Sequence, residues 1–95
     1  MSRRNRVTYT SQAIRHRMLR LFDDAETVRV HKYHKDIIMV LIVSESWEGM
    51  GVSKRISHAI DRIEDVLPDI SRRFTTIVET VTPQEYATRS VPWPR

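Results

Sequence analysis

The longest apolar run in the chain is Ile37–Val43, seven residues without a polar side chain and rich in β-branched ones. A helix of typical length needs more residues, and a strand exposed on one face alternates apolar with polar positions. The run therefore predicts a strand covered on both faces, at the centre of a sheet. It is far shorter than the roughly 20 apolar residues of a membrane-spanning helix, so we expect no membrane insertion.

Apolar residues recur at helical spacing in two segments that flank this run, 11–22 before it and 52–67 after it. Thr10 and Ser11 are both good N-cap residues for the first helix. Pro68 ends the second helix, because a proline in a helix interior removes a hydrogen bond and clashes with the preceding turn. We therefore expect one amphipathic helix on each side of the central strand in the sequence.

Two further segments have strand patterns. Residues 27–32 alternate apolar with polar side chains, and residues 74–81 are rich in β-branched side chains. The polar segment 33–36 is expected to form a hairpin turn, and 69–73 to turn the chain before the last strand. Because a strand–helix–strand unit crosses over right-handedly, the last strand should lie parallel to the central one and beside it. These elements predict an α+β fold of αββαβ order, with a three-stranded mixed sheet and both helices on one face.

A chain of 95 residues is long enough for one domain with one modest core. We place that domain at residues 10–88, between a basic N-terminal tail at 1–9 and a C-terminal tail at 89–95. The chain has no cysteine, which excludes a disulfide framework, a zinc ribbon and a thiol nucleophile, and agrees with a cytoplasmic location. The basic N-terminus does not continue into an apolar stretch, so we expect no secretory signal.

Charge is distributed unevenly along the chain. The net charge is +4, from 16 Lys and Arg against 12 Asp and Glu, and the first acidic residue is Asp23. The charged residues before it are all arginines: Arg3, Arg4, Arg6, Arg15, Arg17 and Arg20. Those in the first helix lie off its apolar face and form an exposed basic surface. This asymmetry favours an anionic partner such as nucleic acid, although a tail that only solubilises the chain explains it equally well.

The segment from Gly49 to Arg55 leads from a loop into the second helix. Gly49 and Gly51 allow close approach of the backbone, and the helix N-terminus favours an anion, as do Lys54 and Arg55. The segment matches neither a Walker A loop nor a GxxG loop, so it carries no nucleotide-binding signature. It either contacts a nucleic-acid phosphate or simply connects the loop to the helix.

Trp47 is a large apolar residue in the polar loop before these glycines. We expect it to fold back over the end of the core; the alternative is an exposed ring on which a base or a partner stacks. The sequence offers little for catalysis, because no Ser-His-Asp arrangement, nucleophile elbow or pair of buried carboxylates can be argued from it. We therefore expect a protein that is not an enzyme.

The segment Val43–Gly49 reads Val-Ser-Glu-Ser-Trp-Glu-Gly, a helix with Lys54-Arg55 follows, and the pattern closes on Thr82-Pro83-Gln84-Glu85-Tyr86. This order resembles the BolA family across roughly residues 12–86. Arg55 matches the first residue of the family's Arg-His-Arg core, whereas Ile56 and Ser57 stand at the other two positions. The resemblance implies a fold similar to a class II KH domain, nucleic-acid binding, and partnership with monothiol glutaredoxins through a shared iron–sulfur cluster.

The segment His58–Glu64, with the same αββαβ order, is similar to the cytoplasmic C-terminal domain of cation-diffusion-facilitator transporters. That resemblance implies dimerisation and binding of divalent metal. His31 and His34 would be further nitrogen ligands, but Lys32 and Lys35 beside them disfavour a cation. We therefore expect no intrinsic metal and no cofactor.

The leading hypothesis from the sequence is a small BolA/KH-like module that binds nucleic acid through a basic surface. The competing hypothesis is a protein-interaction module, either a homodimer or a partner of a glutaredoxin-type or transporter protein. Thr75, Ile77 and Val81 on the last strand offer an apolar, β-prone surface for such pairing.

Overall fold

The computed structural model describes residues 7–89 and 92–94. Its elements in chain order are α1 (Ser11–Leu21), β1 (Thr27–His34), β2 (Ile37–Val43), a 3₁₀ turn (Glu45–Trp47), α2 (Val52–Val66), α3 (Pro68–Arg73), β3 (Thr75–Val81) and α4 (Pro83–Thr88). The order β1-β2-β3, antiparallel and then parallel, confirms the expected α+β fold with a three-stranded mixed sheet. Within the described residues, no helix is long and apolar enough to cross a membrane.

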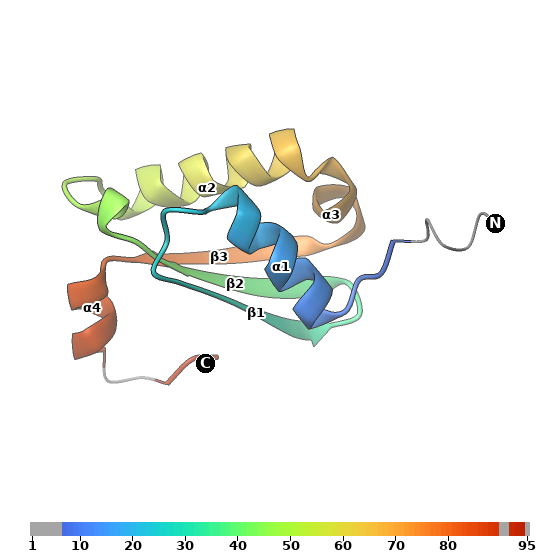
Figure 1. Cartoon of the computed structure of the whole chain (residues 1–95), viewed down its shortest axis with the longest axis horizontal. Coiled ribbons are helices and arrows are strands. Elements are labelled where there is room, and N and C mark those ends of the chain that lie inside the picture. Colours follow the sequence, from blue (N-terminus) through green and yellow to red (C-terminus); the bar gives the residue numbers. More distant parts are fainter. Residues whose placement is uncertain (1–6, 90–91, 95) are drawn as a thin grey trace.

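One face of the sheet packs against α1 and α2 (Figure 1). The two helices bury their apolar stripes on this face, as their 3.6-residue periodicity predicts. On the strands, alternate residues point into the same core, because successive side chains of a strand point to opposite faces. The buried strand residues of this core are Val28, Ile38, Val40, Ile42 and Val78.

The opposite face of the sheet is partly covered by the C-terminal segment. Leu41 and Val43 point away from the helical core yet are almost fully buried. The Trp93 ring lies 5.5 Å from the Arg29 guanidinium and 6.3 Å from the His31 ring, so the expected C-terminal tail instead contacts β1. This cover agrees with the continuous apolar sequence of β2, which was expected to be buried on both faces.

Two local structures differ from the expectation. Residues 68–73 form the short helix α3 rather than a turn, because Pro68, which ends α2, also fits the first turn of a new helix. Strand β1 continues to His34 through an irregularity between Lys32 and His34. The hairpin turn is therefore shorter than the four residues expected.

Trp47 covers the end of the core, as expected. Its side chain is only 3% exposed, and its indole N–H donates to the carbonyl of Ile42 at 3.1 Å. The hydroxyl of Ser44 accepts from the backbone N–H of Ser46 and shapes the 3₁₀ turn that brings the ring back. The ring is thus part of the fold and is not available for stacking on a base.

Candidate nucleic-acid interface

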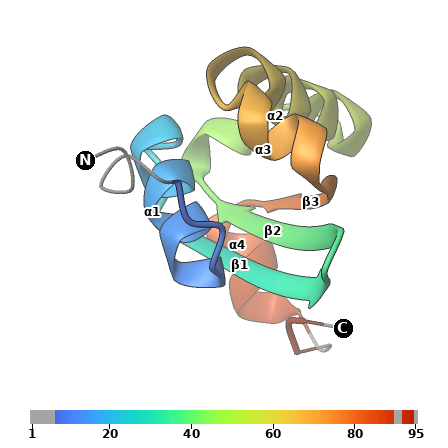
Figure 2. The same cartoon turned by 90° about the vertical axis from the view of Figure 1, so that its right-hand side faces the viewer.

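Two turns of the fold meet at one end of the sheet. Because β2 and β3 are parallel, the hairpin turn before β2 and the connection from α3 to β3 lie at the same end, which faces the viewer in Figure 2. The backbone N–H of Thr75 donates to the carbonyl of Asp36 at 2.8 Å and ties the two turns together. We call the cations at these turns the basic end: Lys32, Lys35, Arg72 and Arg73.

Two of these cations are held by aromatic rings. Tyr9 and Phe74 pack edge to face with ring centroids 5.9 Å apart. The Arg73 guanidinium lies 4.4 Å from the Tyr9 ring, and the Lys32 ammonium lies 5.7 Å from the Phe74 ring. Lys32 also donates to the carbonyl of Tyr9 at 3.3 Å. A ring face positions a cation without neutralising its charge, so both charges stay available to an anion.

The basic end keeps its positive charge because the ion pairs within the described residues do not include its four cations. All four of these side chains are exposed. Tyr33 stands on the adjoining hairpin with 62% of its surface exposed, and His34 beside it is exposed as well. The arrangement offers point charges for phosphates and, on the adjoining hairpin, a largely exposed aromatic ring that meets the His31 ring edge to face.

A network of three side chains supports this end. The Arg17 guanidinium binds Asp69 through two bonds of 2.6 and 2.8 Å, and the Tyr9 hydroxyl donates to the same carboxylate at 2.9 Å. The bonds from Arg17, followed by the one from Tyr9, hold the pKa of Asp69 well below its usual range. The bond to Asp69 in turn raises the pKa of Tyr9. Arg17, expected to bind phosphate, is therefore already paired with a carboxylate.

Asp69→Asn is expected to lower the free energy of unfolding by about 1–2 kcal/mol near neutral pH, because it removes a two-bonded but partly exposed ion pair. The folded-state pKa of Asp69 is lowered, so its contribution is fully present above the unfolded pKa of about 3.9 and is lost as the pH falls through the folded value. Urea unfolding of both proteins between neutral pH and about pH 3 measures the difference, which should shrink in acid.

Asp36→Asn is the matched control for this measurement, since it removes an exposed aspartate from the same end of the sheet. We expect it to change stability by less than about 0.5 kcal/mol. Equal losses in the two variants, or a loss in Asp69→Asn that does not shrink in acid, would contradict the structural role of the network.

The other arginines of α1 lie away from the basic end. The Arg15 guanidinium donates to the carbonyl of Val28 at 2.8 Å and fastens α1 to β1. Arg20 is exposed and, with Arg17 and Arg62, borders a hollow of about 330 Å³ between α1 and α2. Arg62 donates to the carbonyl of Leu21 at 3.3 Å. Arg20 and Arg62 therefore lie at this hollow, apart from the basic end.

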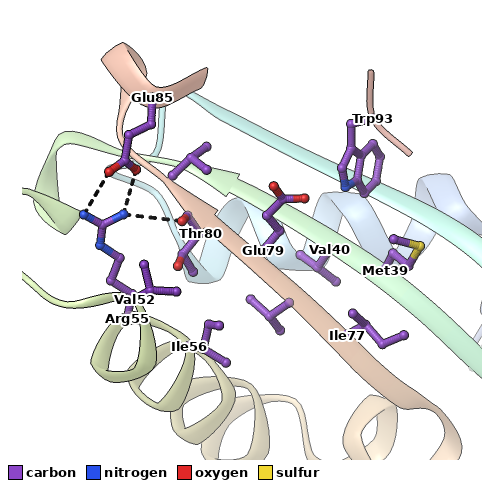
Figure 3. A pocket seen from close by; sticks show the side chains of 12 residues that line it. Met39, Val40, Val52, Arg55, Ile56, Ile77, Glu79, Thr80, Glu85 and Trp93 are labelled. Atoms are coloured by element: carbon purple, nitrogen blue, oxygen red, sulfur yellow. Dashed lines mark hydrogen bonds and ion pairs between the residues drawn. The ribbon is translucent and has the colours of Figure 1, made fainter. Parts of the chain in front are cut away.

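Arg55, which was expected to bind phosphate, is buried and already paired with a carboxylate. It is 6% exposed, and its guanidinium meets the Glu85 carboxylate through bonds of 2.7 and 3.3 Å (Figure 3). Its Nε donates to the carbonyl of Met50 at 2.7 Å. Glu85 also caps α4 by accepting from the backbone N–H of Thr82, and the bonds from Arg55 and then Thr82 lower the pKa of Glu85. The prediction that Arg55 offers its charge to a ligand is not supported by this placement.

The glycine loop and Lys54 lie at the opposite end of the sheet from the basic end (Figure 1). Gly49 has a φ of +76°, a backbone conformation that favours glycine, so its role is to turn the chain. Gly51 is the N-cap residue of α2, and Lys54 is exposed in the first turn of that helix. The structure therefore does not join this loop and the basic end into one surface.

Arg3, Arg4 and Arg6, expected to bind nucleic acid, lie outside the described residues. The sequence interpretation did not name the residues of the basic end as a candidate site. The sequence does contain an indication of this grouping. The predicted parallel pairing of the last two strands places the hairpin turn and the turn before the last strand at the same end of the sheet. In the sequence, Lys32 and Lys35 lie at and in the hairpin turn, and Arg72 and Arg73 lie in the turn expected before the last strand.

The histidines considered as metal ligands are separated in the fold. His31 packs against Tyr33 and Trp93, with ring centroids 6.3 Å away in both cases, whereas His58 lies on α2 against Trp47 at 6.1 Å. Across residues 7–89 and 92–94, the structure contains no group of three or more His, Cys, Asp or Glu side chains placed to hold a metal ion.

The resemblances to the BolA family and to the transporter C-terminal domains rest on the sequence patterns alone. Comparison with protein-family models and with curated proteins finds no match.

Proposed function

We propose that this domain binds nucleic acid through the basic end, mainly by contacts to phosphates and with little dependence on base sequence. The observation that carries the proposal is the convergence of Lys32 and Lys35 from the β1–β2 hairpin with Arg72 and Arg73 from the end of α3, with no carboxylate of the described residues paired to them. Cations that are not paired with a carboxylate can contact phosphates and release the counterions bound to a nucleic acid. This release supplies most of the affinity of non-specific complexes.

The neighbouring residues fit the same partner. Tyr33 gives the basic end an exposed aromatic ring, and every base has a π-face that can stack on it. Tyr9 contacts Arg73, so the first described segment of the chain joins the fold at this end. The proposed resemblance to the BolA family and the class II KH fold implies the same class of partner.

The first test is a titration of labelled single-stranded and duplex DNA and RNA with the full chain. We expect dissociation constants of about 1–100 μM near physiological salt, the range of non-specific complexes. If four cations contact phosphates of a single strand, raising the salt from about 50 to about 200 mM should weaken binding by about 50-fold. Failure to bind at the lower salt concentration would refute the proposal.

Charge reversal locates the site. The double variant Lys35→Glu, Arg72→Glu changes two exposed side chains of the basic end and should weaken binding by at least about tenfold, with a salt slope shallower by about 2. The control is Lys54→Glu, which reverses an exposed cation at the opposite end of the sheet and should stay within about twofold of the original chain. A larger loss in Lys54→Glu than in the double variant would move the site to the glycine loop, one of the segments in which the sequence predicts phosphate contacts.

A further inference from the structure

Strand β3 forms an open edge of the sheet. In a parallel pair, alternate residues bond to the neighbouring strand and the residues between them point their backbone groups the other way. The N–H of Thr75 donates to the carbonyl of Asp36, and the N–H of Ser44 donates to the carbonyl of Val81. These two bonds show which residues of β3 face β2: the odd-numbered ones bond to it. The backbone N–H and C=O groups of Thr76, Val78 and Thr80 therefore point outward from the sheet, and the carbonyl of Thr80 accepts from the Arg55 guanidinium at 3.5 Å.

The open edge has few of the features that usually prevent two edges from pairing, since its single charged residue, Glu79, is paired with Arg89. Its residues are Thr75, Thr76, Ile77, Val78, Glu79, Thr80 and Val81, with no lysine, arginine, proline or bulge. The other edge strand, β1, carries Arg29 and Lys32 and has an irregularity near its end. Natural sheets use such charges and bulges to block edge-to-edge association. One edge of this sheet is protected in this way and the other is not.

Apolar side chains flank the open edge on both sides of the sheet. A hollow of about 460 Å³ lies along β3, and it is lined by residues from both faces. Figure 3 shows Val52 and Ile56 of α2 on one side of the strand, and Ile77, Met39 and Trp93 on the other. Val52 is 60% exposed and Ile77 is 47% exposed. The edge is thus a strip of free backbone groups between two apolar borders, which suits an added strand.

We propose that the open edge binds the same edge of a second copy of this chain, with the two β3 strands antiparallel. A twofold axis at Ile77 places Thr76 of one copy opposite Val78 of the other, so the outward backbone groups of these two residues find partners in both copies. The Ile77 side chains then lie directly opposite each other, in a pair without backbone hydrogen bonds between them.

Two properties favour a second copy over another partner. In a twofold pairing, Thr76 of each copy lies opposite Val78 of the other, so the edge matches itself. Such a pairing joins two three-stranded sheets into one sheet and leaves neither β3 strand open. The edge also carries no unpaired charge among these residues, since Arg55 is paired with Glu85 and Glu79 is paired with Arg89. The charges of the basic end lie at the start of β3 and beyond, so two positively charged copies can meet along the strand.

Cross-linking at Ile77 tests this geometry in the full chain, which has no natural cysteine. Directly opposite residues without backbone hydrogen bonds have Cα atoms about 4.5 Å apart, within the range that a disulfide bridges. Mild oxidation should therefore convert Ile77→Cys largely to a disulfide-linked dimer, and a reducing agent should cleave the disulfide and return the monomer. Val66→Cys is the matched control, an equally exposed apolar residue at the end of α2, and should stay mostly monomeric. Equal cross-linking of the two variants would overturn the proposal.

A mass measurement in solution gives a second readout without covalent chemistry. Light scattering should show a concentration-dependent dimer for the original chain and for Val66→Lys, and a monomer for Ile77→Lys, because two opposed lysines repel. Circular dichroism confirms that Ile77→Lys is folded, as its exposed position predicts. A monomeric original chain at the highest concentration reached, or an unchanged dimer in Ile77→Lys, would overturn the proposal. Both experiments omit nucleic acid, so their outcome is independent of the basic end.

Discussion

Replacing Trp47 with alanine is expected to lower the free energy of unfolding by about 3–5 kcal/mol, the usual cost of deleting a buried aromatic side chain. The ring closes the core at the end of the sheet where β2 leaves it, and its N–H satisfies the carbonyl of Ile42. A domain of this size has a total stability of about 5–14 kcal/mol, so the variant should retain only part of its folded population on mild heating.

The second tryptophan supplies the control for this prediction. Trp93 is half-buried and packs on the opposite face of the sheet against Arg29 and His31. Trp93→Ala should cost less than about 1.5 kcal/mol, since it removes a partly exposed ring from the end of the chain. Urea unfolding followed by far-UV circular dichroism compares the two variants without relying on the fluorescence that each mutation removes. A cost for Trp47→Ala no greater than that for Trp93→Ala would contradict its place in the core.

Trp47→Phe separates the packing of the ring from its hydrogen bond. Phenylalanine keeps most of the apolar volume but has no N–H to donate to Ile42. We expect it to cost about 1–2 kcal/mol, the usual range for a buried hydrogen bond whose acceptor is left behind. This variant also remains measurable if the alanine variant does not fold.

The architecture could be predicted from the sequence because its main signals are local. The apolar run Ile37–Val43 identified the central strand, and the spacing in 52–67 identified the helix that crosses over from it. Given those two elements, the right-handed crossover rule placed β3 parallel to β2. The cover over the second face could not be predicted in the same way, since residues 89–95 have no period that indicates where Trp93 packs.

The site was harder to predict because a charged residue has the same sequence signature on a surface and in a buried ion pair. Arg55 is four residues before Ala59 and eight before Ile63, so helical spacing already placed it on the buried stripe of α2. Its partner, Glu85, is thirty residues away and only the folded chain brings the two together. The basic end also depends on two distant turns, and no single segment of the sequence contains it.

Arg55→Met is expected to lower the free energy of unfolding by about 2–4 kcal/mol, although methionine fits the space along the helix. The change leaves the carbonyl of Met50 without its 2.7 Å donor and leaves Glu85 without its cation. Because the Glu85 side chain is half-exposed, water can take over part of its solvation, which keeps the expected cost below that of a fully buried pair.

A double-mutant cycle with Glu85→Gln measures the coupling between the two groups. Glu85→Gln alone should cost about 1–2 kcal/mol, and the double variant should cost less than the sum of the two single changes by about 1–2 kcal/mol. Arg55→Lys should not rescue the loss, because an ammonium cannot reach Glu85, Met50 and Thr80 at once as the planar guanidinium does. Additive single changes, or full stability in Arg55→Lys, would show that Arg55 does not join α2, β3 and α4 and would return it to the residues available for a phosphate.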